Sequence, residues 1–176
     1  ALLFADYCIE DATECDFAML PFDHPLFILY SSGTTGKPKC IVHGAGGVLL
    51  EHQKEHLLHT DLGPDDVVFY YTTCGWMMWN WLVSALACGS TLVLYDGSPG
   101  YPRVDSLLQL IEQERITVFG TSARYIASLE KADARPAAHY DFGSLQTILS
   151  TGSPLAAESF RYVYTHIRQD VLLSSI

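Results

Sequence analysis

The chain has 176 residues, which suits one domain or a large part of one, and 49% of them are apolar, enough for a core. A formal net charge of −10 argues against nucleic acid or an acidic membrane as a partner, because both require a basic surface. No apolar run approaches the roughly 20 residues of a membrane span, and the first residues do not read as a signal peptide, so we expect a cytoplasmic protein.

The cysteines and the two ends of the sequence lead to two further expectations, on the state of the thiols and on the length of the protein. Five cysteines without a CxxC pair favour reduced thiols in or near a core over a disulfide framework or a metal site. The sequence begins at Ala1 without Met and stops in the apolar run VLLSSI, so we expect a piece of a longer protein.

After a weakly patterned lead-in over residues 1–20, short apolar runs alternate with segments of helical spacing. The predicted strands, the first of them buried, are 26–31, 40–42, 67–71, 91–95, 116–120, 145–152 and 170–175. The predicted helices, the last of them with Pro154 at its first position, are 44–60, 79–89, 104–114, 122–132 and 154–167. This alternation predicts an α/β fold: a largely parallel sheet with helices on both faces.

A segment rich in hydroxyls and glycines, YSSGTTGKPK, follows the first predicted strand at residues 30–39. It is not a Walker phosphate loop, because only two residues separate Gly33 from Gly36, and Pro38 stands where Ser or Thr should bind magnesium. Proline also disfavours the α region in the residue before it, so we predict the path strand, flexible loop, strand.

The composition of this loop still fits a phosphate group. Glycines let backbone N–H groups approach an anion, hydroxyls donate hydrogen bonds, and a lysine supplies a mobile charge. The residues with these properties are Ser31, Ser32, Gly33, Thr34, Thr35, Gly36 and Lys37. An ordinary Ser/Gly surface turn is the alternative.

YSSGTTGKPK closely resembles the signature phosphate loop of the adenylate-forming superfamily. The resemblance extends through HPLFILYSSGTTGKPKCIVHGAGG and YYTTCGWMMWNWLVSALACGSTLVLYDGSP, which are similar to the acyl-CoA synthetase branch. KEHLLHTDL, TTCGWMMWNW and STGSPL are most similar to members that activate acetoacetate. The resemblance implies that residues 21–176 are part of the AMP-binding N-terminal domain of such an enzyme.

The reaction that this resemblance implies uses ATP and Mg²⁺ to convert a carboxylic acid into an acyl adenylate, with release of pyrophosphate. Transfer of the acyl group to coenzyme A then releases AMP. We expect a short acid, with acetoacetate as the first candidate, small molecules as the partners, and a place in lipid metabolism and ketone-body use.

Residue roles also come from the resemblance. Within the loop it assigns catalytic roles at the phosphates to Thr34, Thr35 and Lys37, and ATP binding to the whole loop. It assigns packing against the adenine to Gly152, Ser153 and Pro154, where a plain turn into a helix is the alternative. No protein ligand to a metal is expected.

A substrate pocket is the expected role of the segment CGWMMWNW at residues 74–81. Trp76 matches a tryptophan that walls the small carboxylate in the acetyl-CoA branch. Met78, Asn80 and His43 are further candidates, and Asn80 would donate to a 3-keto oxygen. A cluster of Trp and Met is also typical of a plain core, which is the alternative.

Other motifs of such enzymes would lie beyond Ile176: an ATP and magnesium motif, a ribose-binding Asp, a hinge and a C-terminal lysine. We therefore expect the chain by itself to be inactive without a C-terminal domain. The alternative functions are an acetyl-, propionyl- or other acyl-CoA synthetase, an amino-acid adenylation domain, and a non-catalytic nucleotide-binding remnant.

Three histidines share one predicted helix face: His52, His56 and His59. Their i, i+4, i+7 spacing can hold zinc, but no HExxH motif is present, so we predict a packing or solvated face.

Overall fold

The computed structural model describes residues 14–31 and 36–176. The chain divides into two compact units, Ala1–Gly47 and Val48–Ile176, which are called unit 1 and unit 2 below. None of the helices in the described part of the chain has the length and apolarity that crossing a membrane requires.

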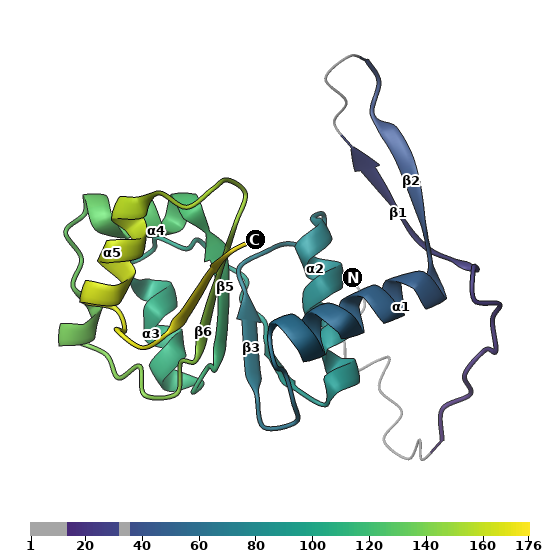
Figure 1. Cartoon of the computed structure of the whole chain (residues 1–176), viewed down its shortest axis with the longest axis horizontal. Coiled ribbons are helices and arrows are strands. Elements are labelled where there is room, and N and C mark those ends of the chain that lie inside the picture. The colour runs from purple at the N-terminus through teal and green to yellow at the C-terminus, as the bar shows by residue number, and fades with distance from the viewer. Residues whose placement is uncertain (1–13, 32–35) are drawn as a thin grey trace, which may run out of the picture. The chain divides into compact units, whose positions relative to one another are not determined.

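Unit 1 contains a β-hairpin (Figure 1). Strand β1 (Pro25–Ser31) pairs antiparallel with β2 (Lys39–Gly44), and helix α1 (Ala45–Lys54) begins directly after β2. The prediction of a buried first strand is wrong, because Leu26 and Ile28 are 55% and 53% exposed. A two-stranded ribbon has no further strand or helix of its own to cover its faces, which explains this exposure.

Unit 2 is built on a parallel sheet of five strands in the order β4-β3-β5-β6-β7. These strands are β3 (Val67–Tyr70), β4 (Thr91–Val93), β5 (Val118–Ser122), β6 (Thr147–Thr151) and β7 (Leu172–Ser175). The helices that connect them are α2 (Met77–Ser84), α3 (Ser106–Gln113), α4 (Ala123–Lys131) and α5 (Ala157–His166). Three short helices are η2 (Glu55–His59), η3 (Ala85–Cys88) and η4 (Pro136–Ala138).

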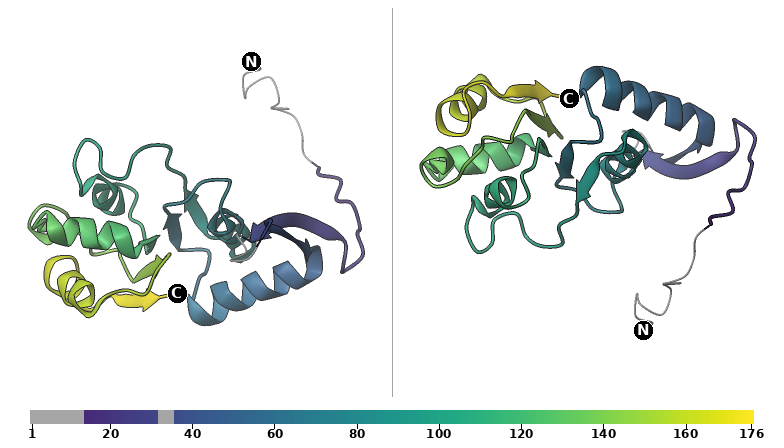
Figure 2. Two further views of the ribbon diagram at one scale, coloured as in Figure 1. Left: turned by 90° about the horizontal axis from the view of Figure 1, so that it is seen from above. Right: turned by 90° about the horizontal axis from the view of Figure 1, so that it is seen from below.

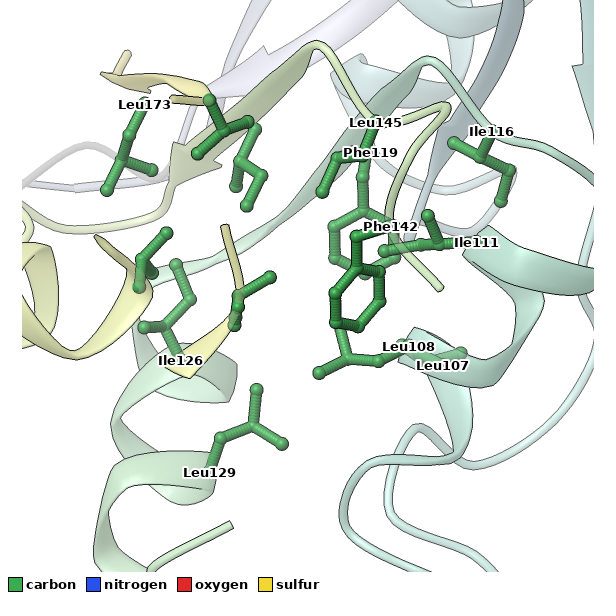
Figure 3. Close-up of a cluster of buried hydrophobic side chains, with 14 of the residues drawn as sticks. Leu107, Leu108, Ile111, Ile116, Phe119, Ile126, Leu129, Phe142, Leu145 and Leu173 are labelled. Carbon is green, nitrogen blue, oxygen red and sulfur yellow. The ribbon is translucent and has the colours of Figure 1, made fainter. Parts of the chain in front are cut away.

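Helices cover both faces of the sheet of unit 2, as predicted, because side chains alternate along each strand. Phe69, Phe119 and Ile148 belong to the core that also contains residues of α3, α4 and α5. Figure 3 shows Phe119 in this core with Leu107, Leu108 and Ile111 of α3 and Ile126 and Leu129 of α4. Val68 and Val118, one residue earlier in their strands, face a second core with α2. Figure 2 shows α3–α5 (green to yellow) along one side of the sheet. Each fully buried Leu, Ile or Phe contributes about 1.5–3 kcal/mol.

The order of the strands creates a topological switch between β3 and β5. The chain leaves β3 toward β4 at one edge of the sheet, and leaves β5 toward β6 and β7 at the other. In open parallel sheets ligands bind at the carboxyl ends of the strands at such a point. The fold therefore favours a site beyond Tyr70 and Ser122.

Several local predictions need correction. Helix α5 begins at Ala157, so Pro154 precedes the helix by three residues and is not its first position. The predicted helix 79–89 begins earlier, at Met77, and its last turn tightens into η3 before Gly89, whose φ of 81° ends it. Of the described cysteines, Cys15, Cys40 and Cys74 are exposed rather than in a core.

Arg168, in the segment before β7, forms hydrogen bonds to the loop before β6. Its Nη1 donates to the carbonyl oxygens of Phe142, Gly143 and Leu145 at 2.7, 3.0 and 2.6 Å, and its Nε donates to Asp170 at 2.7 Å.

We expect Arg168→Ala to lower the free energy of unfolding of the chain by about 2–4 kcal/mol, because three carbonyls lose a charged donor. Urea unfolding measures this. Arg161→Ala, which removes an exposed ion pair with Glu158, is the control and should cost less than about 1 kcal/mol; equal effects would contradict the prediction.

Candidate functional site

The base of the predicted phosphate loop is a strand pair of unit 1. Ser31 ends β1, is half-buried and pairs with Lys39 at the start of β2, so the two ends of the loop are about 5 Å apart. Gly36 and Lys37 are exposed, and Lys37 forms no ion pair among the described residues. The remaining predicted residues, Ser32, Gly33, Thr34 and Thr35, lie outside the described residues. The predicted path of strand, loop and strand is confirmed at both ends.

His43, a predicted substrate residue, lies in the same hairpin but away from the loop. It pairs with Phe27, and the two rings are 5.1 Å apart between centroids. It lies four positions after Lys39, which is about 13 Å along a strand. Unit 1 therefore does not bring His43 to the base of the loop.

The predicted adenine turn lies at the carboxyl end of β6 in unit 2. Gly152, Ser153 and Pro154 are exposed, and Gly152 has a φ of 88°, a conformation that favours glycine. Two hydrogen bonds hold this turn to the end of β7: Thr151 Oγ1 donates to the Ile176 carbonyl at 3.2 Å, and the Leu155 N–H donates to Ser175 Oγ at 3.2 Å.

The predicted substrate segment reaches the same rim of the sheet from β3. Trp76 is the N-cap residue of α2 and is 70% exposed, and its N–H donates to the Thr73 carbonyl at 3.0 Å. Because β5 separates β3 from β6, the strands that lead to Trp76 and to Gly152 are about 10 Å apart. Asn80 is half-buried, whereas Met78 packs against the second core, as the alternative of a plain core predicts.

Tyr70 and Gly120 also lie at this rim and were not predicted as site residues from the sequence. Tyr70 ends β3, pairs with Gly120 of β5 and is 4% exposed, and a Cβ at position 120 would overlap its ring. Burial raises the pKa of the Tyr70 phenol, so it remains protonated, and its hydroxyl has no hydrogen-bond partner among the described residues. A lone glycine inside a buried strand is the signal that indicates such a close approach.

Two further hydroxyls near the rim are buried. Thr121 and Ser150 pair with each other across β5 and β6 and are 1% and 0% exposed. Neither hydroxyl has a hydrogen-bond partner within the part of the chain that the structure describes. Buried polar groups without partners are costly, so the carboxyl end of this sheet is not optimised for stability alone.

Two of the three histidines with zinc-like spacing, His52 and His56, are buried in unit 2. His56 is fully buried, its ring lies 4.3 Å from that of Trp81, and its Nε2 lies 2.8 Å from Ser84 Oγ. Ser84 donates its proton to the Trp81 carbonyl at 2.7 Å, so His56 donates from Nε2. His59 is exposed. Within the described residues no group of three or more His, Cys, Asp or Glu is placed to hold a metal ion.

His56 makes the stability of unit 2 depend on pH. Burial, and then the neighbouring His52, lowers its pKa from 6.5 to about 4. Between pH 6.5 and pH 4 the unfolded chain binds a proton at His56, whereas the folded chain does not. The contribution of neutral His56 to the free energy of unfolding is therefore complete above pH 6.5 and is lost as the pH falls through 4. We expect the free energy of unfolding to fall by about 2 kcal/mol between pH 7 and pH 4.5.

Urea unfolding at a series of pH values measures this slope. His56→Gln, which retains a donor toward Ser84, should remove most of it. His59→Gln, the exposed control, should leave it unchanged. An unchanged slope in His56→Gln would show that other groups cause the pH dependence.

The sequence that contains the predicted phosphate loop, the rim turn and the five-stranded parallel sheet matches a known family, described as AMP-binding enzyme, over residues 6–174. The chain belongs to the AMP-binding enzyme family. This match covers nearly the whole chain and confirms the resemblance to adenylate-forming enzymes.

Curated relatives within the AMP-binding enzyme family carry related names. The chain is 54% identical to an acetoacetyl-CoA synthetase of Gallus gallus over 167 residues, which are 95% of this chain and 25% of that protein. It is 57% identical to an acetoacetyl-coenzyme A synthetase of Rhizobium meliloti over 160 residues, 91% of this chain and 25% of that protein. A malonamoyl-CoA synthetase of Penicillium aethiopicum is 46% identical over 180 residues, with 94% and 25% covered. The chain thus spans about a quarter of the length of these relatives.

Solved structures of the family share the fold. The acetoacetyl-CoA synthetase from Streptomyces lividans superposes with a TM-score of 0.89 at 47% identity, covering 95% of this chain and 26% of that one. A luciferase-like enzyme from Zophobas morio superposes with a TM-score of 0.73 at 22% identity, covering 90% of this chain and 36% of that one, which shows the fold alone.

Proposed function

We propose that the chain is a segment of an acyl-CoA synthetase that activates a short carboxylic acid, with acetoacetate as the first candidate. The observation that carries this proposal is its identity of 54% and 57% to proteins named acetoacetyl-CoA synthetase. In this proposal residues 21–176 are the middle of the N-terminal domain, residues 1–20 lead into it, and turnover requires a C-terminal domain.

The chemistry requires charge stabilisation at the phosphates of ATP. A carboxylate is a poor electrophile and must be activated before it can be transferred to a thiol. In the activation step the carboxylate oxygen attacks the α-phosphate of ATP, and pyrophosphate leaves. Negative charge develops on the pyrophosphate as it leaves. In this proposal Lys37 and the hydroxyls of the loop stabilise this charge. Mg²⁺ bound together with ATP beside Lys37 would neutralise further phosphate charge, and coenzyme A would accept the acyl group in the second step.

The rim of unit 2 supplies the other roles in this proposal. The turn of Gly152, Ser153 and Pro154 is open to solvent at the carboxyl end of β6, where a nucleotide binds in parallel sheets. Trp76, at the N-cap of α2, and Asn80, within that helix, are the candidates that contact the acid. His43 is the weakest candidate, because unit 1 places it beside Phe27 and not at the loop.

A second candidate acid comes from the relative named malonamoyl-CoA synthetase, which is 46% identical. Malonamate and acetoacetate are both short acids with a carbonyl group at carbon 3, and they differ in an amino group and a methyl group. We therefore propose that the site recognises a short acid with a carbonyl group at carbon 3.

A chimera tests the function: the Streptomyces lividans enzyme with its matching segment replaced by this chain. We expect exchange of labelled pyrophosphate into ATP with acetoacetate, weaker exchange with malonamate, and little with butyrate or acetate, which lack the 3-carbonyl group. Preference for acetate or propionate would favour the alternative acyl-CoA synthetases. A folded chimera without exchange would favour a non-catalytic remnant.

The 176-residue chain by itself should show no exchange, and activity there would refute the requirement for further domains.

A further inference from the structure

An open cavity of about 490 Å³ lies in unit 2 between the segment before α3 and the segment after α4. Its volume falls within the range of about 300–1,000 Å³ that is typical of small-molecule sites. The residues that line it are Arg103, Val104, Asp105, Ala132, Asp133, Ala134, Arg135 and His139. None of them has a role in the proposed reaction.

One wall of the cavity holds a fixed ion pair. The Asp105 carboxylate is 4% exposed and accepts hydrogen bonds from Arg103 Nε at 3.0 Å and Nη2 at 2.8 Å. This pairing neutralises the buried carboxylate and orients the guanidinium, whose Nη1 forms no hydrogen bond among the described residues. Arg103 therefore presents one free donor edge in a defined orientation.

The second arginine that lines the cavity, Arg135, forms only a weak ion pair. Arg135 Nη2 lies 3.4 Å from both carboxylate oxygens of Asp133, longer than the about 2.7–2.9 Å of a strong charged hydrogen bond. Both side chains are mostly exposed, at 64% and 79%, so this pair contributes little to stability. Arg135 is thus available to an external anion that offers better geometry.

The backbone beneath these side chains is well anchored. The Asp133 N–H donates to the Glu130 carbonyl at 3.0 Å, and the Ala134 N–H donates to Leu129 at 3.1 Å. The Tyr162 hydroxyl donates to the Ala134 carbonyl at 2.8 Å. Because these hydrogen bonds already fix the backbone, the segment loses little conformational entropy when a ligand binds.

We propose that this cavity binds a small organic anion, a carboxylate or a phosphate ester. Its head group lies between Arg135 and the free edge of Arg103, and its apolar part lies on the small wall formed by Val104, Ala132 and Ala134. Guanidinium groups match the oxygen pairs of both head groups, and two arginines at one cavity are unusual in a chain with a net charge of −10. An adjacent cavity shares Asp133 with this one, and its one arginine, Arg161, is paired with Glu158 at 2.8 Å.

The test measures how fast phenylglyoxal modifies each arginine, resolved by mass spectrometry, in the chimera and in the 176-residue chain. The probes are propyl phosphate and butyrate, which share a three-carbon tail and differ in the head group, with butyramide as the neutral control. We expect one or both anions at about 10 mM to slow modification of Arg135 about fivefold, as for a millimolar site. Arg124, an exposed arginine on α4 outside the cavity, is the internal control.

A variant sharpens the test by removing the competing carboxylate. Asp133 has a φ of 48°, which asparagine tolerates, so Asp133→Asn preserves the loop. We expect it to lower the anion concentration for half-protection about threefold, whereas Asp65→Asn, an exposed control elsewhere, leaves it unchanged.

Protection by one anion alone identifies the head group, and protection by both supports a general anion site. No protection of Arg135, equal protection of Arg124, or equal protection by butyramide would each overturn the proposal. Loss of exchange activity in the chimera would not affect it, because this cavity has no part in that reaction.

Discussion

Lys37→Ala in the chimera lowers the rate of pyrophosphate exchange by about 100- to 1,000-fold, the effect expected when a pre-placed donor to developing charge is lost. The physical reason is that Lys37 lies in the loop closed by the Ser31–Lys39 pair and is exposed, so its ammonium group is available to phosphate oxygens. Initial rates with saturating acetoacetate and varied ATP measure the change.

The neighbouring lysine provides the matched control. Lys39 is also exposed but is part of β2, so its side chain is fixed to the strand and not to the loop. We expect Lys39→Ala to retain exchange within about threefold, as for a surface residue. Equal losses in both variants would indicate a general electrostatic effect, and full activity in Lys37→Ala would refute the assigned role.

Gly120→Ala is expected to destabilise the chain by about 3 kcal/mol, as for overpacking of a buried site. The new Cβ would overlap the ring of Tyr70, which is buried and packs edge-on against Trp81 at 5.9 Å between centroids. The ring cannot move without disturbing the second core, because that core also contains Trp81. Urea unfolding measures the change.

A double-mutant cycle identifies the cause of this loss. Tyr70→Leu shortens the side chain that opposes position 120 and costs about 2 kcal/mol by itself. Adding Gly120→Ala to Tyr70→Leu should then cost less than about 1 kcal/mol, because the overlap is gone. Additive costs would show that the backbone conformation at Gly120, and not the contact with Tyr70, requires glycine.

The fold could be predicted from the sequence because pattern and topology agree in unit 2. Apolar runs such as 67–71 and 116–120 alternate with amphipathic segments, and this order permits only a parallel sheet with crossovers. The boundaries were less accurate, as at Pro154, since proline fits both a turn and a first helical position. Burial of β1 was predicted wrongly because an apolar run does not specify what covers it.

The candidate site could be predicted only where its residues are consecutive. The loop around Lys37 and the turn at Gly152 are continuous motifs, so local composition indicates them. Tyr70 and Gly120 are fifty positions apart, and their contact arises from the pairing of β3 with β5. The same holds for the cavity between Arg103 and Arg135, which no local spacing in the sequence reveals.

The position of β7 at the edge of the sheet has a consequence for handling the chain. Its outer row of amide and carbonyl groups is not matched by another strand among the described residues, and Leu172 is 55% exposed. Such an edge is a template onto which a strand of a second molecule can add. At high concentration the isolated polypeptide is therefore prone to self-association, starting from its last strand.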